Sequence, residues 1–84
     1  MTALDVDIDQ IMTDEFSPTR RDPVSAEYKQ GARAALHFRF RGTHIINPYR
    51  PGTARRDAFF AGTSEGHRIF RLLAGERINL NYKN

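Results

Sequence analysis

Residues 46–62, INPYRPGTARRDAFFAG, decide the fold of this chain. Pro48 and Pro51 fix φ and push the residues before them out of helical geometry, so no helix can run through 47–52. Thr53 is placed to cap a helix that we predict over 54–73, with Gly75 as its C-terminal stop. The stretch is therefore predicted to be a turn that leads directly into a long helix.

A second principal helix is predicted upstream, over 23–37, with Asp22 as its N-cap and Pro23 as its first residue. The segment HFRFRGTHII at 37–46 then interrupts the helical pattern, because aromatic and basic residues alternate in FRFR. It is compatible with a short strand, an extended arm or the frayed end of the helix. The tail at 77–82 is compatible with a strand or a loose end.

Small residues recur one turn apart on both predicted helices, as Gly31 with Ala35 and as Gly62 with Gly66. Glycine inside a helix costs about 1 kcal/mol relative to alanine. These positions are easiest to understand if two helix backbones approach closely there. The alternative is that the second helix ends or kinks near Gly62.

The N-terminal residues support a further helix or a strand. Apolar residues between Leu4 and Phe16 recur at helical spacing, whereas those between Leu4 and Ile8 also alternate with aspartates. We favour a helix, because Thr2 followed by Asp5 resembles a capping box.

Charge is segregated along the 84 residues. Six acids and two bases at 1–22 give −4, whereas eleven bases and four acids at 23–84 give +7. We therefore divide this small, mainly α chain into an acidic N-terminal segment with its linker (1–22) and a basic helical domain (23–84). Eleven of the bases in the whole chain are arginines, whose guanidinium groups match phosphate oxygens. This pattern predicts a phosphate-rich partner such as RNA.

Several classes of protein are not indicated. The chain has no cysteine and no apolar run near the roughly 18 residues of a membrane span, so we expect a cytoplasmic protein without a membrane partner. His37, His44 and His67 lack the spacing of metal ligands, and no glycine loop carries the lysine of a phosphate-binding loop. We expect no metal, no cofactor and no enzymatic activity. Self-association into a homodimer is an open option for so small a core.

Three short motifs within roughly 26–71 carry a family resemblance: YKQGARAA, NPY, and RRDAFFAG followed by Gly66. Together they resemble the ribosome modulation factor family, which includes small ciprofloxacin-resistance proteins. The resemblance implies a fold of two helices joined by a connector, and a function in binding ribosomal RNA. It also implies that Asn47, Pro48 and Tyr49 shape the connector and that arginines lie at the start of the second helix. The chain departs from the family in its acidic extension, the inserted FRFRGTHII and its C-terminal tail. The family's usual tryptophan positions hold phenylalanine or no comparable residue.

Candidate binding residues are arginines interleaved with aromatic residues, the combination that holds phosphates and unpaired bases. They are Arg39, Arg41, Tyr49, Arg50, Arg55 and Arg56. Residues expected to have structural roles are Gly31, Asn47, Pro48, Gly62 and Gly66. The phenylalanines at 38, 40, 59 and 60 are expected in the core.

The leading hypothesis is an RNA-binding protein that acts on ribosomes or another structured RNA. The first alternative is a protein-binding inhibitor or adaptor of phage or mobile-element origin, whose acidic segment occludes a partner's surface or folds back over the basic body. The second is a drug-modifying enzyme like the resistance proteins, for which the sequence shows no site.

Overall fold

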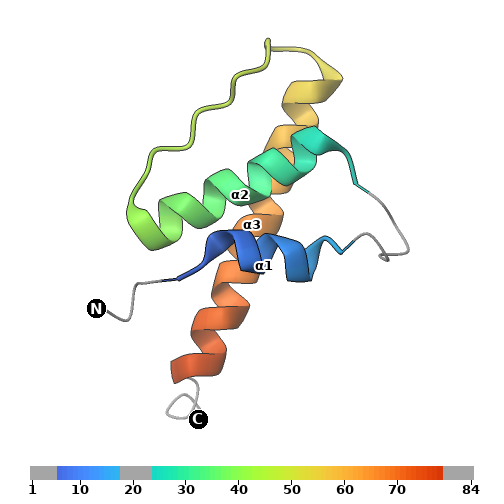
Figure 1. The fold of residues 1–84 in the computed structure, drawn as a ribbon. Helices are drawn as coiled ribbons and strands as arrows, with labels where there is room; N and C mark the ends of the chain where they lie inside the picture. The colour runs from blue at the N-terminus through green and yellow to red at the C-terminus, as the bar shows by residue number, and fades with distance from the viewer. Residues whose placement is uncertain (1–5, 18–23, 79–84) are drawn as a thin grey trace.

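The computed structural model describes residues 6–17 and 24–78, and within them the chain forms three helices and no strand. They are α1 (Ile8–Glu15), α2 (Ala26–Arg41) and α3 (Ala54–Ile78). Figure 1 shows α2 and α3 crossing, with α1 below α2 and in front of α3. The predicted small, mainly α fold with two principal helices and an additional N-terminal one is confirmed.

The two long helices cross with their chains running in the same direction, and in this sense they are parallel. Tyr28 of α2 meets Gly62, Ala35 meets Gly66, and Phe40 packs against Phe70, so the contacts advance in the same direction along both helices. Parallel neighbours need a connection that returns along the first helix. The segment 42–53, called the connector below, makes this return, and Figure 1 shows it rising beside α2 to the start of α3.

The helix backbones touch where they cross. A Cβ added to Gly31 would lie 1.9 Å from the carbonyl oxygen of Phe59, and one added to Gly62 would lie 1.9 Å from that of Tyr28. At Gly66 the added Cβ would lie 2.7 Å from the Cβ of Ala35. The predicted close approach is confirmed, and α3 continues unbroken through Gly62, so the alternative of a helix end there is wrong.

Helix α1 is part of the same core as the basic body. Asp7 caps it, accepting a hydrogen bond from the Gln10 N–H at 3.1 Å. The buried side chains of this core come from all three helices and from the residue that caps the C-terminus of α1: Ile8, Met12, Phe16, Ala32, Leu36 and Ile69. The helix prediction is confirmed, while the proposed cap at Thr2 lies outside the described residues.

Helix α2 has different ends from those predicted. It begins at Ala26, capped by the Ser25 hydroxyl, which accepts from the Tyr28 N–H at 3.1 Å, so the start at Pro23 is wrong. Asp22 and Pro23 lie outside the described residues. The helix continues to Arg41, where Gly42 ends it in the left-handed region with φ 77°. FRFR is therefore the last turn of α2 and not a strand.

Helix α3 begins as predicted and ends later. The Thr53 hydroxyl accepts from the Arg56 N–H at 3.2 Å, which confirms the N-cap. The helix runs past Gly75 to Ile78, so the predicted stop at 73 is wrong. Residues 77 and 78 are helical, which overturns a strand or loose end for that part of the tail; residues 79–82 lie outside the described residues.

Candidate nucleic-acid interface

A hydrogen-bond network closes the turn that joins the connector to α3. The side chain of Asn47 accepts from the Tyr49 N–H at 3.0 Å and donates to the Arg56 carbonyl at 3.2 Å. The Thr53 hydroxyl also donates to the Arg50 carbonyl at 2.8 Å. Asn47 thus caps its own turn, as its residue type indicates. These bonds tie 47–56 into one unit, called the tip below.

Arg56 is a structural member of the tip. Its Nη1 donates to the Tyr49 carbonyl at 2.8 Å, and its guanidinium lies 5.1 Å from the centre of the Phe60 ring. The side chain is half-buried between these partners. The structure therefore gives this predicted binding residue a role in holding the turn.

Tyr49 is also occupied by the fold. Its ring meets Phe59 edge-on at 6.2 Å between centroids, and its hydroxyl donates to the side chain of Gln30. This packing fixes the connector to both long helices, and it leaves the ring half-buried.

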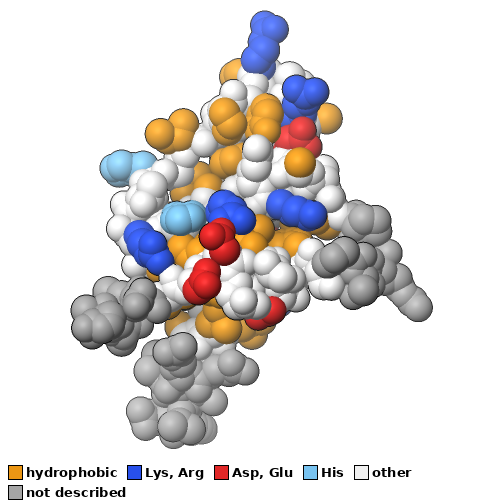
Figure 2. All heavy atoms as spheres, in the orientation of Figure 1, with side chains coloured by type: hydrophobic (Ala, Val, Ile, Leu, Met, Phe, Trp, Pro, Cys, Tyr) orange, Lys and Arg blue, Asp and Glu red, His pale blue; other side chains and the backbone are white. Residues whose placement is uncertain are grey.

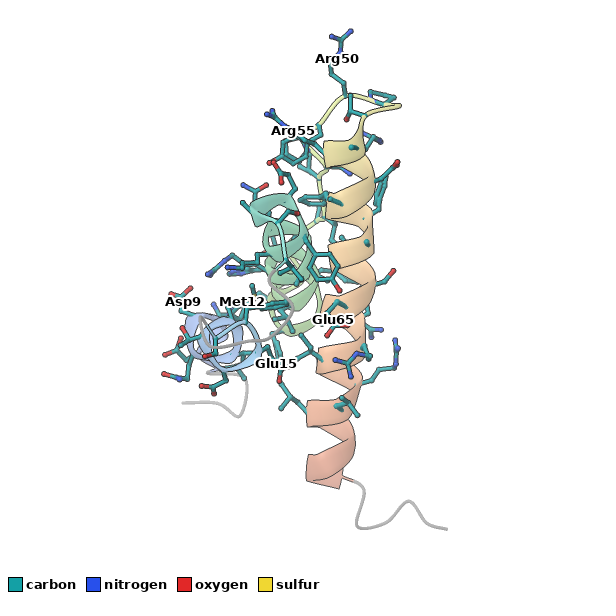
Figure 3. All side chains as sticks on the ribbon, turned by 90° about the vertical axis from the view of Figure 1, so that its right-hand side faces the viewer. Asp9, Met12, Glu15, Arg50, Arg55 and Glu65 are labelled. Atoms are coloured by element: carbon teal, nitrogen blue, oxygen red, sulfur yellow. The ribbon has the colours of Figure 1, made fainter. Side chains whose placement is uncertain are left out.

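Arg50 and Arg55 are the exposed arginines of the tip. Among the described residues, no hydrogen bond or ion pair holds the Arg50 side chain. Figure 3 shows this side chain at one end of the molecule, pointing outward. The Nε atom of Arg55 lies 3.7 Å from a carboxylate oxygen of Glu27, and the Arg55 side chain is 73% exposed. The tip thus carries two accessible guanidinium groups, one on the connector turn and one in the first turn of α3.

Arg39 and Arg41 lie at the opposite end of α2 from the tip. Arg39 Nε donates to His67 Nδ1 at 3.0 Å, and its guanidinium lies 4.8 Å from the centre of the Phe70 ring. Burial lowers the pKa of His67, and the positive charges of Arg39 and Arg71 lower it further. Arg41 donates to the Val6 carbonyl. Both predicted binding residues therefore contact other parts of the chain and do not join the tip.

Two of the four phenylalanines expected in the core are exposed. Phe38 and Phe60 are 42% and 46% exposed, whereas Phe59 is buried and Phe40 packs against Phe70 at 5.0 Å between ring centroids. Phe59 and Phe60 are adjacent on α3, and adjacent helical positions point to different sides. The core prediction is therefore wrong for Phe38 and Phe60.

An open groove of about 290 Å³ separates α2 from the connector, and the sequence analysis missed it. Helix α2 contributes Gln30, Arg33, Ala34 and His37 to its lining. Four connector residues form the other wall, and α3 adds one: Thr43, His44, Ile46, Pro48 and Phe59. The spacing of 30, 33, 34 and 37 marks one helical face, but its partner wall depends on the path of the connector.

Arg33 joins this groove to α1. It donates a hydrogen bond to Asp9 and forms an ion pair with it, and this contact holds the pKa of the Asp9 carboxyl below its usual value. Figure 2 shows red acidic side chains directly beside blue basic ones and near a histidine on this face. The acidic helix therefore neutralises part of the basic body.

Comparison of the chain with protein-family models, curated proteins and solved structures found no match. Among the described side chains, no group of three or more His, Cys, Asp or Glu residues is arranged to hold a metal ion. In the same part of the chain, no helix combines the length and apolar character that a bilayer crossing requires.

Proposed function

We propose that this chain is a non-enzymatic RNA-binding protein, similar to the ribosome modulation factor family, that acts on ribosomes or another structured RNA. The observation that carries the proposal is the tip, where Arg50 and Arg55 stand exposed on a turn braced by Asn47, Thr53 and Arg56. A braced turn loses little conformational freedom on binding, so its charges are already placed for a ligand.

The charge of the body supports the same proposal. Residues 24–75 contain nine Lys and Arg side chains and three acidic ones. An excess of this kind attracts RNA phosphates over a distance, and exposed arginines then form paired hydrogen bonds with phosphate oxygens. Arg55 is paired with Glu27 at 3.7 Å, and because the Arg55 side chain is 73% exposed, its guanidinium remains accessible to a phosphate.

One form of the adaptor alternative has the acidic segment occlude a partner's surface, and it receives no support from the geometry, because apolar side chains of α1 are buried in the chain's own core. The other form has this segment fold back over the basic body, and the ion pair between Asp9 and Arg33 is compatible with it. Affinity purification with and without nuclease separates the two proposals. A stoichiometric protein partner that survives nuclease treatment favours the adaptor, and ribosomal particles that are lost with RNA favour the leading proposal.

The direct test is RNA affinity measured by fluorescence anisotropy over a series of salt concentrations. We expect the double variant Arg50→Gln/Arg55→Gln to bind a single-stranded or looped RNA more weakly. Each lost phosphate contact should also make the slope of log affinity against log salt shallower by about 0.7.

Arg68→Gln/Arg71→Gln is the matched control, because it also removes two positive charges but lies away from the tip. Arg68 is bound to Glu65, and Arg71 lies beside His67. Equal losses in the two double variants would show that net charge alone attracts RNA and would contradict a tip interface. Lack of measurable binding by the unaltered chain would contradict RNA binding altogether.

A further inference from the structure

The groove between α2 and the connector combines positive and apolar walls. Arg33, His37 and His44 are its titratable lining residues, and the Arg33 guanidinium is paired with the Asp9 carboxylate. Phe59 is almost fully buried beneath it, while Ile46 is 75% exposed on the connector side. Gln30 adds an amide, which offers both hydrogen-bond donors and acceptors.

The size of the groove suits one small ligand. Pockets that hold complete drug-sized ligands range from about 300 to 1,000 Å³, and the volume of this groove, about 290 Å³, is just below that range. One nucleotide has the matching chemistry: a flat base for the apolar wall of Ile46 and Pro48, and a phosphate for Arg33. Unpaired RNA bases are commonly held in this way, against apolar or aromatic side chains with a cation at the backbone.

We propose that this groove binds one unpaired nucleotide of an RNA, with its base against Ile46 and Pro48 and its phosphate at Arg33. The inference rests on the proposed function, and it adds a second contact region beside the tip. Pro48 belongs to both regions, so an RNA strand that contacts Arg50 reaches the groove along the connector.

Asp9 occupies the place that the nucleotide phosphate would take. Its carboxylate binds the Arg33 guanidinium, and the side chains are 80% and 44% exposed. An ion pair between exposed groups is weak and exchanges readily. Asp9 also lies close enough to interact with His37. The acidic helix is therefore an internal competitor for the anion site, and RNA must displace this one contact without unfolding α1.

Asp9→Asn tests the competition. We expect it to tighten binding of a short single-stranded RNA by about two- to fivefold, the range set by an exposed charge pair. Asp14→Asn is the matched control, because it removes the same charge from the same helix, and Asp14 bonds only to Gln10 among the described residues. In the Arg33→Gln background, the gain from Asp9→Asn should disappear, because both act through one contact.

Two outcomes separate this inference from the proposed function. If RNA binding depends on Arg50 and Arg55 but Asp9→Asn and Asp14→Asn have equal effects, the groove inference fails and the RNA-binding proposal stands. If the unaltered chain binds no RNA, both fail.

Adenosine monophosphate and inorganic phosphate distinguish a nucleotide site from an anion site. Titration followed by NMR should shift the signals of Ile46 and of the His44 ring with the nucleotide, and leave Ile46 unaffected with phosphate. Equal shifts with both probes would reduce the groove to an anion site and overturn the inference.

Discussion

Gly31 and Gly62 have equivalent positions on the two sides of the helix crossing. At each glycine, the α-hydrogen that stands in place of a Cβ points at a carbonyl oxygen of the facing helix. This oxygen belongs to Phe59 for Gly31 and to Tyr28 for Gly62. Weak Cα–H···O contacts of this kind recur where helix backbones meet. A side chain at either position would push the two long helices apart, because backbone atoms cannot rotate out of its way.

We therefore expect Gly62→Ala to destabilise the protein by about 1–3 kcal/mol, the usual range for overpacking. Alanine favours a helix over glycine by about 1 kcal/mol, so a net loss isolates the effect of the contact. The measurement is urea unfolding followed by circular dichroism.

Gly75→Ala is the control for that experiment, since it makes the same substitution in the same helix with nothing within 4 Å of the added Cβ. It should stabilise the protein by up to about 1 kcal/mol. If both variants gain stability, the helices do not touch at Gly62.

Residue type alone indicated some of these roles and not others. Glycine spacing pointed to the crossing, and Asn47 before a proline pointed to a capped turn. The role of Arg56 was not predictable, because the direction of its guanidinium depends on where the connector places the Tyr49 carbonyl. The groove at Arg33 was missed for the same reason, since a helix face identifies a pocket only when its opposite wall is known.

At the scale of the elements, competing local signals explain the errors in helix bounds. Asp22 and Ser25 are both good N-caps, and the fold uses Ser25, with Val24 packed against the core outside the helix. FRFR has the period of a strand, but it continues the helical spacing of α2 and is followed by a glycine that adopts the left-handed cap. Tertiary contacts decide between such equal local preferences.

The position of the cap can be tested by stability measurements. We expect Ser25→Ala to cost about 1 kcal/mol in urea unfolding, because the Tyr28 N–H loses its acceptor. Asp22→Ala should cost less than Ser25→Ala, because α2 begins at Ala26 with Ser25 as its cap. The opposite ranking would place the start of α2 at Pro23 after all.

Across the whole molecule, opposite charges are paired between elements that are distant in sequence. Asp9 pairs with Arg33 and Glu27 with Arg55, so the first turn and the middle of α2 take part, together with both neighbouring helices. Arg39 instead donates to His67, a contact that requires an unprotonated ring nitrogen. As pH falls, we therefore expect protonation of this histidine to lower the stability of the fold first.

The pKa of His67 in the folded protein lies below its usual value, because of burial and of the positive charges on Arg39 and Arg71. The unfolded chain then takes up more protons as pH falls through about 6.5, so stability should decrease there and level off below the folded pKa. Unfolding curves between pH 8 and 5 measure this decrease.

His67→Asn is the companion variant, because its side-chain oxygen can accept from Arg39 and does not titrate. We expect this variant to make the free energy of unfolding nearly independent of pH in this range. If the free energy changes with pH as in the parent, groups other than His67 cause the effect. The pKa of Asp9 is also lowered, but its stabilising effect is lost only as pH falls below about 4, so the two ranges are separate.

The parallel course of α2 and α3 was the largest feature that sequence could not supply. Two helices joined by a turn usually form an antiparallel pair, and the prolines show only that the helix is interrupted. The direction depends on a connector long enough to return along α2, and its extended course is maintained by tertiary contacts such as Tyr49 with Gln30 and Phe59.

This topology also has a consequence for the rate of folding. The pairs that meet at the crossing, such as Gly31 with Phe59 and Tyr28 with Gly62, are separated by 28 and 34 residues in sequence. These contacts cannot form until a loop of that length has closed, and such closure slows folding relative to helical hairpins, whose contacts are local. The hydrogen bonds of the braced turn that presents Arg50 and Arg55 counteract part of this slowing, because each bond reduces the number of conformations that the connector can adopt before the loop closes.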